Sequence, residues 1–396
     1  MSNAIAIGFS QAEDIKEAAH QASVAVKNQL NSITTDFVLV FASIGYIHKD
    51  ALDVIHTILK PKKLIGSSTL GIILGNGIYK RGIGILAINS ADFHVGIASH
   101  DFKTNLNHRQ LGFELSRQMV ADYKSPLPRR AAVILYDPLI PFKNVFTLGT
   151  REVLGLNLKT AGAFSCDDFK LKDSYQIIQK KILNRNIAGF IIGCESEIIV
   201  GNRHGFKPLG KPRMVTSSKD NIIITIDNKP AISIYEEYLK KEAQDIRLGL
   251  LNSAAVFYPL GIYQQNLRQY LLRYPIDILS DGSIVCQAEI PPKTEVHLMI
   301  SNKDSCRASA ALTAQEVKDS MGKREAQVLL VFNSMTKSKI LGRNSSVELE
   351  SIQRVFGSSV PIFGMYSFGE LSPLGINENE METYLQNGSL TIIAIS

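Results

Sequence analysis

The stretch Ile362-Phe-Gly-Met-Tyr-Ser-Phe-Gly-Glu-Leu371 places two glycines around a Tyr-Ser pair and leads into a glutamate. Two weaker copies lie upstream. Gly66-Ser-Ser-Thr-Leu-Gly71 repeats the glycine spacing, and Gly162-Ala-Phe-Ser-Cys-Asp167 keeps the first glycine and a serine. Glycine permits positive φ and a close approach of the backbone. The copies therefore predict tight turns, which either present their hydroxyl groups to a ligand or only carry the chain across a sheet.

The three copies share their surroundings. An apolar strand is predicted before each copy, at 37–41, 132–136 and 328–332, and another after it, at 84–88, 188–192 and 390–394. A unit of strand, helical connector, glycine turn and closing strand, used about three times, predicts an α/β (α+β) fold with mixed β-sheets flanked by helices. We expect two such sheets.

Local patterns predict several smaller elements. The runs 175–182 and 187–192 are predicted as a pair of strands around Asn184-Arg-Asn186. Ser345-x-x-Glu348 has the spacing of a capping box at the start of a helix. Ile222–Ile226 and the turn at Asp227 read as a hairpin, after which a helix opens. Because the pattern changes there, we predict two domains, 1–230 and 231–396.

Composition restricts the class of protein. The chain has 396 residues, of which 45% are hydrophobic, so a globular core is expected. The formal net charge is +6, but the basic residues are dispersed in short pairs without interleaved aromatics, so we expect no nucleic-acid partner. Neither a secretory leader nor an apolar run long enough to span a membrane is predicted. We therefore expect a cytoplasmic location and no membrane insertion.

The four cysteines, Cys166, Cys194, Cys286 and Cys306, stand far apart without C-x-x-C spacing. That distribution is typical of a reducing compartment and argues against a structural zinc site. Buried thiols are therefore the default expectation.

Polar residues of the last glycine stretch are candidate ligand contacts, because Tyr366, Ser367 and Glu370 are costly to bury unless something satisfies them. A small zwitterion needs a clamp for its carboxylate, which Arg273 could supply, and an acceptor for its ammonium group, which Glu370 could supply. The backbone at two glycines would help to orient it: Gly364 and Gly369. Alternatively, Arg273 and Glu370 form a structural ion pair.

A haem-based gas sensor is a second hypothesis. Haem iron needs a proximal donor such as histidine, and the ring needs an apolar pocket. Among the eight histidines we select His204 as the candidate ligand, because it lies in the turn Arg203-His-Gly205 and precedes Phe206. The competing interpretation is a structural histidine. Since the sequence has no C-x-x-C-H, covalent haem attachment is not predicted.

The sequence does not predict an enzyme. It lacks Gly-x-Ser-x-Gly, H-E-x-x-H, Walker A and strand-linked G-x-G-x-x-G motifs. A hydrolase that none of these motifs describes is the remaining alternative.

A set of spaced motifs resembles the FIST family over about residues 34–390. The motifs are Val215-Thr216, Asp227–Ala231, Tyr235, Tyr258-Pro-Leu-Gly261, Leu272-Arg273, Asp281-Gly-Ser283 and Phe363–Glu370. The resemblance implies an N-terminal and a C-terminal FIST domain in a bacterial intracellular sensory protein. It implies binding of a small ligand, for which free amino acids were proposed. The implied partner is a histidine kinase or a cyclic-di-GMP enzyme, that is, a diguanylate cyclase or phosphodiesterase. One branch of the family is linked to haem and nitric-oxide sensing.

Several positions depart from the pattern of that family. Ser67 and Ser334 stand where a cysteine is common, Ile72 where an acid is common, and Phe206 where many members have tryptophan. These departures remove candidate thiols and soft ligands. We therefore expect a non-catalytic small-ligand sensor, with the haem sensor as the alternative and haem as its only candidate cofactor.

Overall fold

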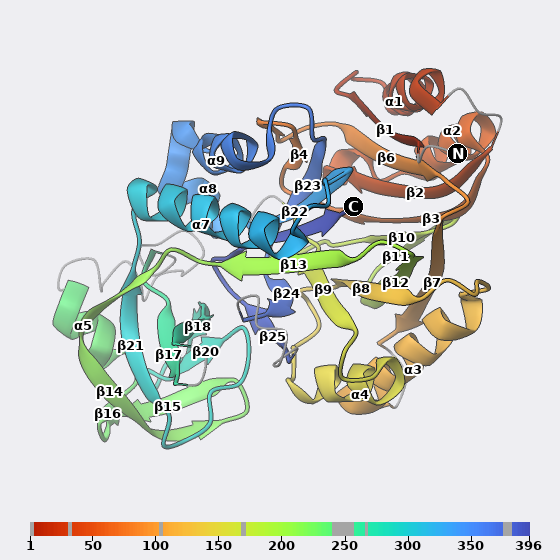
Figure 1. Cartoon of the computed structure of the whole chain (residues 1–396). Coiled ribbons are helices and arrows are strands. Elements are labelled where there is room, and N and C mark those ends of the chain that lie inside the picture. Colours follow the sequence, from red (N-terminus) through yellow and green to blue (C-terminus); the bar gives the residue numbers. More distant parts are fainter. Residues whose placement is uncertain are drawn as a thin grey trace.

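The computed structural model describes residues 4–30, 34–102, 106–167, 172–239, 257–265, 268–374 and 382–396. These residues form three mixed sheets of six strands each and one antiparallel sheet of eight strands. The three mixed sheets gather in one body, and the antiparallel sheet lies beside it at the lower left of Figure 1. The expectation of two mixed sheets was wrong, because apolar runs locate strands but do not say which strands pair across the chain.

The first sheet has the strand order β1-β6-β2-β3-β10-β11. Its strands are β1 (Ala4–Ser10), β2 (Thr35–Ala42), β3 (Pro61–Ser68), β6 (Ile83–Asn89), β10 (Gln176–Ile178) and β11 (Lys181–Leu183). Only β2 and β3 are parallel, and the other neighbours are antiparallel.

The second and third sheets repeat this order. The second contains β7 (Phe93–Asp101), β12 (Asn186–Cys194), β8 (Arg129–Tyr136), β9 (Lys159–Phe164), β24 (Glu370–Pro373) and β25 (Thr383–Gln386). The third contains β13 (Ile198–Arg203), β26 (Leu390–Ile395), β22 (Val328–Ser334), β23 (Ile362–Ser367), β4 (Ile72–Leu74) and β5 (Gly77–Tyr79). Each has one parallel pair, β8 with β9 and β22 with β23. That the three units are related to one another stays a prediction.

Each mixed sheet receives its last hairpin from another part of the chain. After β3 the chain leaves the first sheet, and β4 pairs with β23 of the third. After β9 it leaves the second sheet, and β10 pairs with β3. After β23 it leaves the third sheet, and β24 pairs with β9. All three glycine stretches therefore carry the chain from one sheet to another. This was one of the two alternatives that their sequence left open.

This exchange overturns one smaller expectation. The run 175–182 does not form one strand that pairs with 187–192. It folds back on itself as the hairpin β10–β11 and joins the first sheet, whereas β12 lies in the second. The chain turns at Gln179, where φ is +53°. The sequence does not predict this turn, because glutamine rarely adopts a positive φ.

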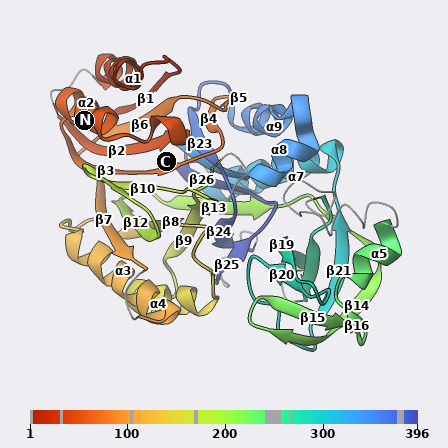
Figure 2. The ribbon, with the colours of Figure 1, turned by 180° about the vertical axis from the view of Figure 1, so that it is seen from behind.

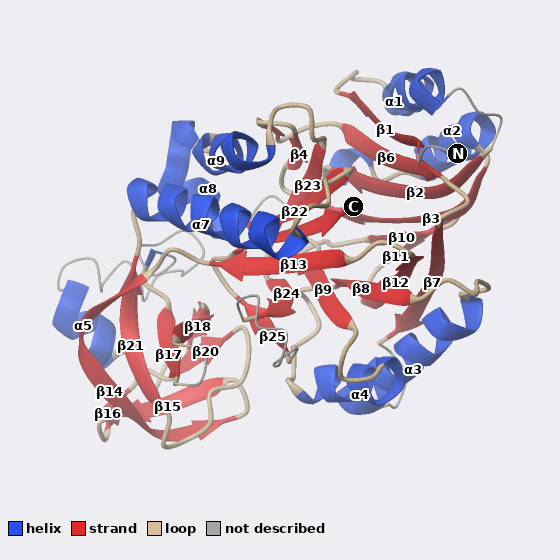
Figure 3. Ribbon diagram, in the orientation of Figure 1, coloured by secondary structure: helices blue, strands red, loops and turns tan. Residues whose placement is uncertain are grey.

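Helices cover the outer face of each mixed sheet, as Figure 3 shows. They are α1 (Ile15–Leu30) and α2 (Lys49–Leu59) on the first, α3 (His108–Asp122) and α4 (Val145–Leu154) on the second, and α7 (Lys303–Met321) and α9 (Val347–Phe356) on the third. Short helices are η1 (Ile44–Tyr46), α8 (Met335–Leu341) and η4 (Gly342–Asn344). No helix among the described residues is long and apolar enough to cross a membrane.

The inner faces of the three mixed sheets share one core. Because successive side chains in a strand point to opposite faces, alternate residues of β2, β8, β12, β22 and β23 meet in a single apolar cluster. Phe41 of the first sheet stacks on Phe363 of the third at a centroid distance of 5.2 Å. Figure 2, seen from behind, shows the same convergence of the sheets.

The first glycine of each crossing is required by packing. A Cβ at Gly66, Gly162 or Gly364 would lie 2.3, 2.2 or 1.9 Å from a carbonyl oxygen of the neighbouring parallel strand. No side chain can be accommodated at such a distance without moving backbone. These glycines therefore belong to the strand pairing itself.

The antiparallel sheet contains β14 (Lys207–Lys219), β15 (Ile222–Ile226), β16 (Lys229–Pro230), β17 (Leu260–Gln264), β18 (Gln269–Arg273), β19 (Pro275–Ile278), β20 (Ile284–Cys286) and β21 (Glu295–Ile300). The turn after β15 and the following helix α5 (Ser233–Leu239) lie where the sequence predicts a hairpin and a helix. The domain boundary at 230 and 231 stays a prediction, although strand pairing in the mixed sheets crosses it.

Candidate functional site

The three glycine crossings meet in what we call the turn junction, residues 66–71, 162–167 and 364–369. The hydroxyls of Ser67 and Ser165 lie 2.6 Å apart. The Thr69 hydroxyl and the Cys166 thiol both donate to the carbonyl of Tyr366, at 2.8 and 3.0 Å. The Tyr366 amide donates to the carbonyl of Gly71 at 2.8 Å. Most of the polar groups named here thus bind one another.

Glu370, a predicted ligand contact, sits in the hydrogen-bond network at the edge of this junction. Ser367 donates to its Oε1 at 2.6 Å, and the hydroxyl of Ser389 donates to its Oε2 at 2.7 Å. Asn202 donates to Ser389 at 2.8 Å. Burial raises the pKa of Glu370 to about 8, and the hydrogen bonds and nearby Lys337 oppose that shift. The carboxyl group therefore carries a proton over much of the neutral range.

A fully buried ion pair lies next to this network. Lys337 of α8 and Glu348 of α9 are both 0% exposed, and their Nζ and Oε1 atoms lie 2.8 Å apart. Asn333, at the end of β22, donates to the other oxygen of Glu348 at 2.8 Å. The pair stands at the carboxyl ends of the parallel strands β22 and β23, where ligands bind in open α/β sheets. We call these three residues the buried ion-pair cluster.

Two polar atoms beside this cluster have no partner among the described residues: the hydroxyl of Tyr366 and Oδ1 of Asn333. Burial, followed by the charge of Glu348, raises the pKa of Tyr366 well above its ordinary value. A buried polar group left without a hydrogen bond destabilises the fold by about 1–3 kcal/mol. The cluster therefore has the capacity for at least one further hydrogen-bonding partner.

Lys337 was not predicted from the sequence as a site residue, and Glu348 was predicted as part of a helix cap. The capping-box prediction was wrong: α9 begins at Val347, its N-cap Ser346 makes no side-chain cap bond, and Glu348 turns inward to Lys337. Lysine and glutamate are rarely buried unless paired. The only available signal was the position of Lys337 shortly after an apolar strand.

Arg273 is buried in β18, but its guanidinium is occupied by backbone. Its NH1 donates to the carbonyls of Leu272 and Leu385, both at 2.9 Å, and its Nε donates to that of Glu289 at 3.3 Å. Burial lowers its pKa to about 10. Among the described residues it contacts no carboxylate, so the alternative of an ion pair with Glu370 was wrong. The assignment of Arg273, Gly364, Gly369, Tyr366, Ser367 and Glu370 as ligand contacts stays a prediction.

His204 uses both ring nitrogens in internal contacts. The Phe206 amide donates to its Nδ1 at 2.8 Å, which leaves the proton on Nε2, and this atom donates to the carbonyl of Tyr270 at 3.0 Å. Burial, with the charge of Lys337 next, lowers its pKa to about 3. A haem ligand needs one free nitrogen, so the arrangement of His204 does not fit haem iron. The described residues also contain no group of three His, Cys, Asp or Glu side chains placed to hold a metal ion.

An open cavity of about 330 Å³ lies around His204, and we call it the His204 pocket. It is bounded by the turn before β14, the start of β18 and one face of α7. Its lining residues are Arg203, His204, Gly205, Phe206, Lys207, Arg268, Gln269, Tyr270, Ser305, Ala308, Ser309 and Leu312. A Cβ at Gly205, where φ is +77°, would lie 2.7 Å from the Ser309 hydroxyl, so the turn rests directly on α7.

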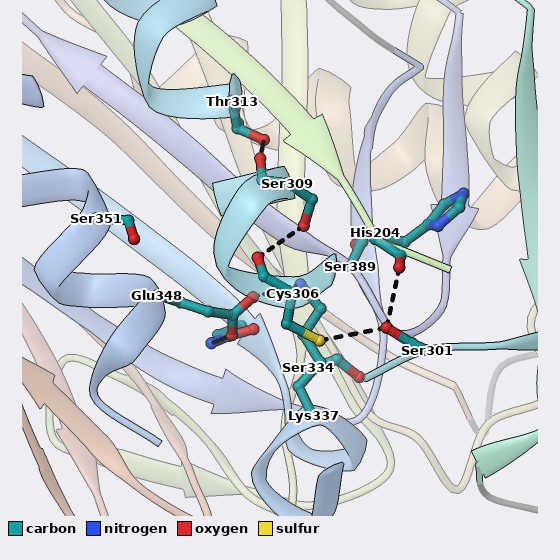
Figure 4. Close-up of polar contacts among 12 residues, drawn as sticks. His204, Ser301, Cys306, Ser309, Thr313, Ser334, Lys337, Glu348, Ser351 and Ser389 are labelled. Carbon is teal, nitrogen blue, oxygen red and sulfur yellow. Dashed lines mark hydrogen bonds and ion pairs between the residues drawn. The ribbon is translucent and has the colours of Figure 1, made fainter. Parts of the chain in front are cut away.

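Short contacts join the His204 pocket to the interior. Figure 4 shows Ser301 between Cys306 and the backbone beside His204. Its hydroxyl donates to the carbonyl of Gly205 at 2.9 Å and lies 3.4 Å from the sulfur of Cys306. Lys337 influences the pKa of both His204 and Cys306 by its charge. The charge of the buried ion-pair cluster therefore reaches the residues of the pocket.

Two other cavities lie elsewhere. A groove of about 1080 Å³ runs between the ends of α3 and α4 and the start of β13, and a cavity of about 180 Å³ lies near Cys194 and Ser396. Neither contains any of the ligand residues predicted from the sequence. The four cysteines are buried, and no disulfide joins any of the described residues.

Comparisons with known proteins match both halves of the chain to family models. The FIST N domain model matches residues 36–229, and the FIST C domain model matches residues 231–373. No curated protein sequence matches the chain. Among solved structures, a cyanuric acid hydrolase is 8% identical over 100% of both chains with a TM-score of 0.40, and a chorismatase is 7% identical over 100% of both chains with a TM-score of 0.36. Scores this low carry no conclusion about activity.

Proposed function

Because the chain belongs to the FIST family, whose domains are sensory domains, we propose that it is a small-ligand sensory protein without catalytic activity. In this proposal it works in the cytoplasm and regulates a histidine kinase or a cyclic-di-GMP enzyme. The ligand binds in the His204 pocket, and the buried ion-pair cluster responds to its presence.

One observation supports this assignment above the others. The His204 pocket is open to solvent and α7 forms one of its walls, while the charge of Lys337, which is 0% exposed and paired with Glu348, acts on His204. Interactions between charges are strong where water is excluded. A ligand that shifts α7 therefore changes the surroundings of a charged pair whose energy depends strongly on geometry.

Signalling needs a ligand that binds two conformations with different affinity. The contacts at Ser301, Cys306 and Gly205 join the pocket wall to the start of α7. Displacement of that turn would alter the position of the helix relative to Lys337. The proposed output is a change in the surface that the partner enzyme contacts.

A thermal-shift screen of small metabolites, starting with free amino acids, tests the binding step. The pocket-filling variant is Ala308→Trp, because Ala308 lines the pocket and is exposed. The matched control is Gln315→Trp, which is exposed on the same helix but does not line the pocket. We expect at least one compound to raise Tm in the wild type and the control but not in Ala308→Trp. A compound that stabilises all three proteins equally would place the ligand elsewhere, and a screen without any stabilising compound would contradict the proposal.

The signalling step has its own test. Purified histidine kinases and cyclic-di-GMP enzymes from the same genome are assayed with this protein, with and without the stabilising compound. We expect one of these activities to change with the protein and to respond to the compound. If no activity changes in any combination, the proposed partner class is wrong, even if ligand binding stands.

A further inference from the structure

We propose that the His204 pocket recognises a small organic anion, a molecule with one acid group and a compact apolar body. This inference rests on the proposed ligand-binding function and adds the chemical class of the ligand. It follows from the charges, the apolar wall and the size of the pocket.

The charge in the pocket is positive. Lys207 and Arg268 line it and are exposed, and neither forms an ion pair with any described residue. The third cation, Arg203, is held by Glu316 through contacts of 2.9 and 2.6 Å. Among the described residues no aspartate or glutamate lines the pocket. His204 is neutral because both of its ring nitrogens are bound as the neutral tautomer requires. Two cations are therefore available for an anionic ligand.

Neutral polar groups complement those cations. The serines Ser305 and Ser309 stand on the face of α7 that lines the pocket. The Ser309 hydroxyl donates its proton to the carbonyl of Cys306 at 2.9 Å. The Ser305 hydroxyl makes no hydrogen bond with the described residues, so it can donate to a carboxylate or phosphate oxygen.

Apolar side chains line the pocket beside these polar groups. Phe206 is buried, and Ala308 and Leu312 lie on the same face of α7 as Ser305 and Ser309. Leu312 is 47% exposed, which is typical of an apolar residue at the rim of a site. A volume of about 330 Å³ lies at the lower end of the range of ligand pockets, about 300–1,000 Å³. The pocket therefore suits a small amphipathic acid and excludes a large cofactor.

A pair of isosteric probes tests the charge directly. Phenylacetate and its neutral amide, phenylacetamide, differ little in shape, and inorganic phosphate provides an anion without an apolar body. Isothermal titration calorimetry is carried out on the full chain at low salt. We expect phenylacetate to bind at least about tenfold more tightly than either other probe, since hydrogen bonds to charged groups are the stronger ones.

Variants locate the binding. Lys207→Gln and Arg268→Gln should each weaken phenylacetate binding about tenfold or more, whereas Lys323→Gln, just beyond the far end of α7, should leave it unchanged. If the acid and the amide bind equally and Ala308→Trp abolishes both, the charge assignment is overturned. The pocket then remains the ligand site. Binding that survives Ala308→Trp, or the absence of binding by any probe, would overturn this inference. The amino-acid screen on the same variants would then decide whether the pocket binds any ligand.

Discussion

Glu370 is a carboxyl group without exposed surface, held between Ser367 and Ser389. When it is protonated it can donate to Ser367, because the Ser367 hydroxyl has a second acceptor in the carbonyl of Asn333 at 3.3 Å. The network thus accommodates the neutral acid without breaking. Its charge is set by the interior of the protein and not by the solvent.

The raised pKa of Glu370 predicts a pH dependence of stability. Its pKa is about 8 in the folded protein, against an ordinary value of 4.5, so between these values the folded state holds a proton that the unfolded state has lost. Stability contributed by this group is therefore greatest below about pH 4.5 and falls as pH rises towards 8, by up to about 1.4 kcal/mol per pH unit. Chemical denaturation from pH 5 to 9, in steps of roughly one unit, should show a flatter profile for Glu370→Gln than for the wild type. Parallel profiles would contradict the assignment.

Lys337 and Glu348 form a buried ion pair, and its contribution to the free energy of unfolding depends on the presence of both partners. Lys337→Met leaves the Glu348 carboxylate buried without its counter-ion, which should cost about 3–5 kcal/mol of unfolding free energy. Adding Glu348→Gln removes the stranded charge and keeps an acceptor for Asn333. The double variant should therefore regain much of the loss in a denaturant titration. A double variant less stable than the single one would show that the pair is not coupled as described.

At the scale of elements, the crossings depend on glycine where two parallel strands approach most closely. In Gly364→Ala the added Cβ would lie 1.9 Å from the Val331 carbonyl oxygen. We expect a loss of at least about 1–3 kcal/mol, since overpacking moves backbone. Gly45→Ala is the control, because nothing lies within 4 Å of a Cβ there. Thermal denaturation that shifts equally for both variants would refute the packing role.

Elements were predictable from the sequence where periodicity and apolar runs are strong. The strands before and after each glycine stretch, the hairpin near Asp227 and the helix after it are all present. The exchange of hairpins was not predictable, because strand pairing over such separations leaves no local pattern. Lys337 and Glu348 were missed as a pair because a buried lysine and an exposed one look alike in a single sequence. The contacts of Arg273 with the carbonyls of Glu289 and Leu385 could not be predicted, because both residues lie far from it in the sequence.

At the scale of the whole molecule, the hairpin exchange ties the two halves of the chain together. The β4–β5 hairpin completes the sheet of the C-terminal half, and β24–β25 completes a sheet of the N-terminal half. Each half alone would expose strand edges and apolar sheet faces. We therefore expect the two segments matched by the family models to depend on each other for folding.

Separate expression tests this dependence. Fragments 1–230 and 231–396 should each be insoluble or lack a cooperative thermal transition when produced alone. Co-expression should recover a soluble complex with the circular dichroism spectrum of the intact chain. Two fragments that each unfold cooperatively on their own would contradict the role assigned to the exchanged hairpins.

The central claim is that ligand binding in the His204 pocket reaches the buried ion-pair cluster. Hydrogen–deuterium exchange of the full chain, with and without the compound that the screen selects, measures this most directly. We predict altered exchange in the pocket wall, residues 303–312, and also across 333–348, where Asn333, Lys337 and Glu348 lie. The second change should disappear in Lys337→Met. Altered exchange confined to the pocket wall would mean that the protein binds the compound without transmitting its presence, and the proposed sensory mechanism would be wrong.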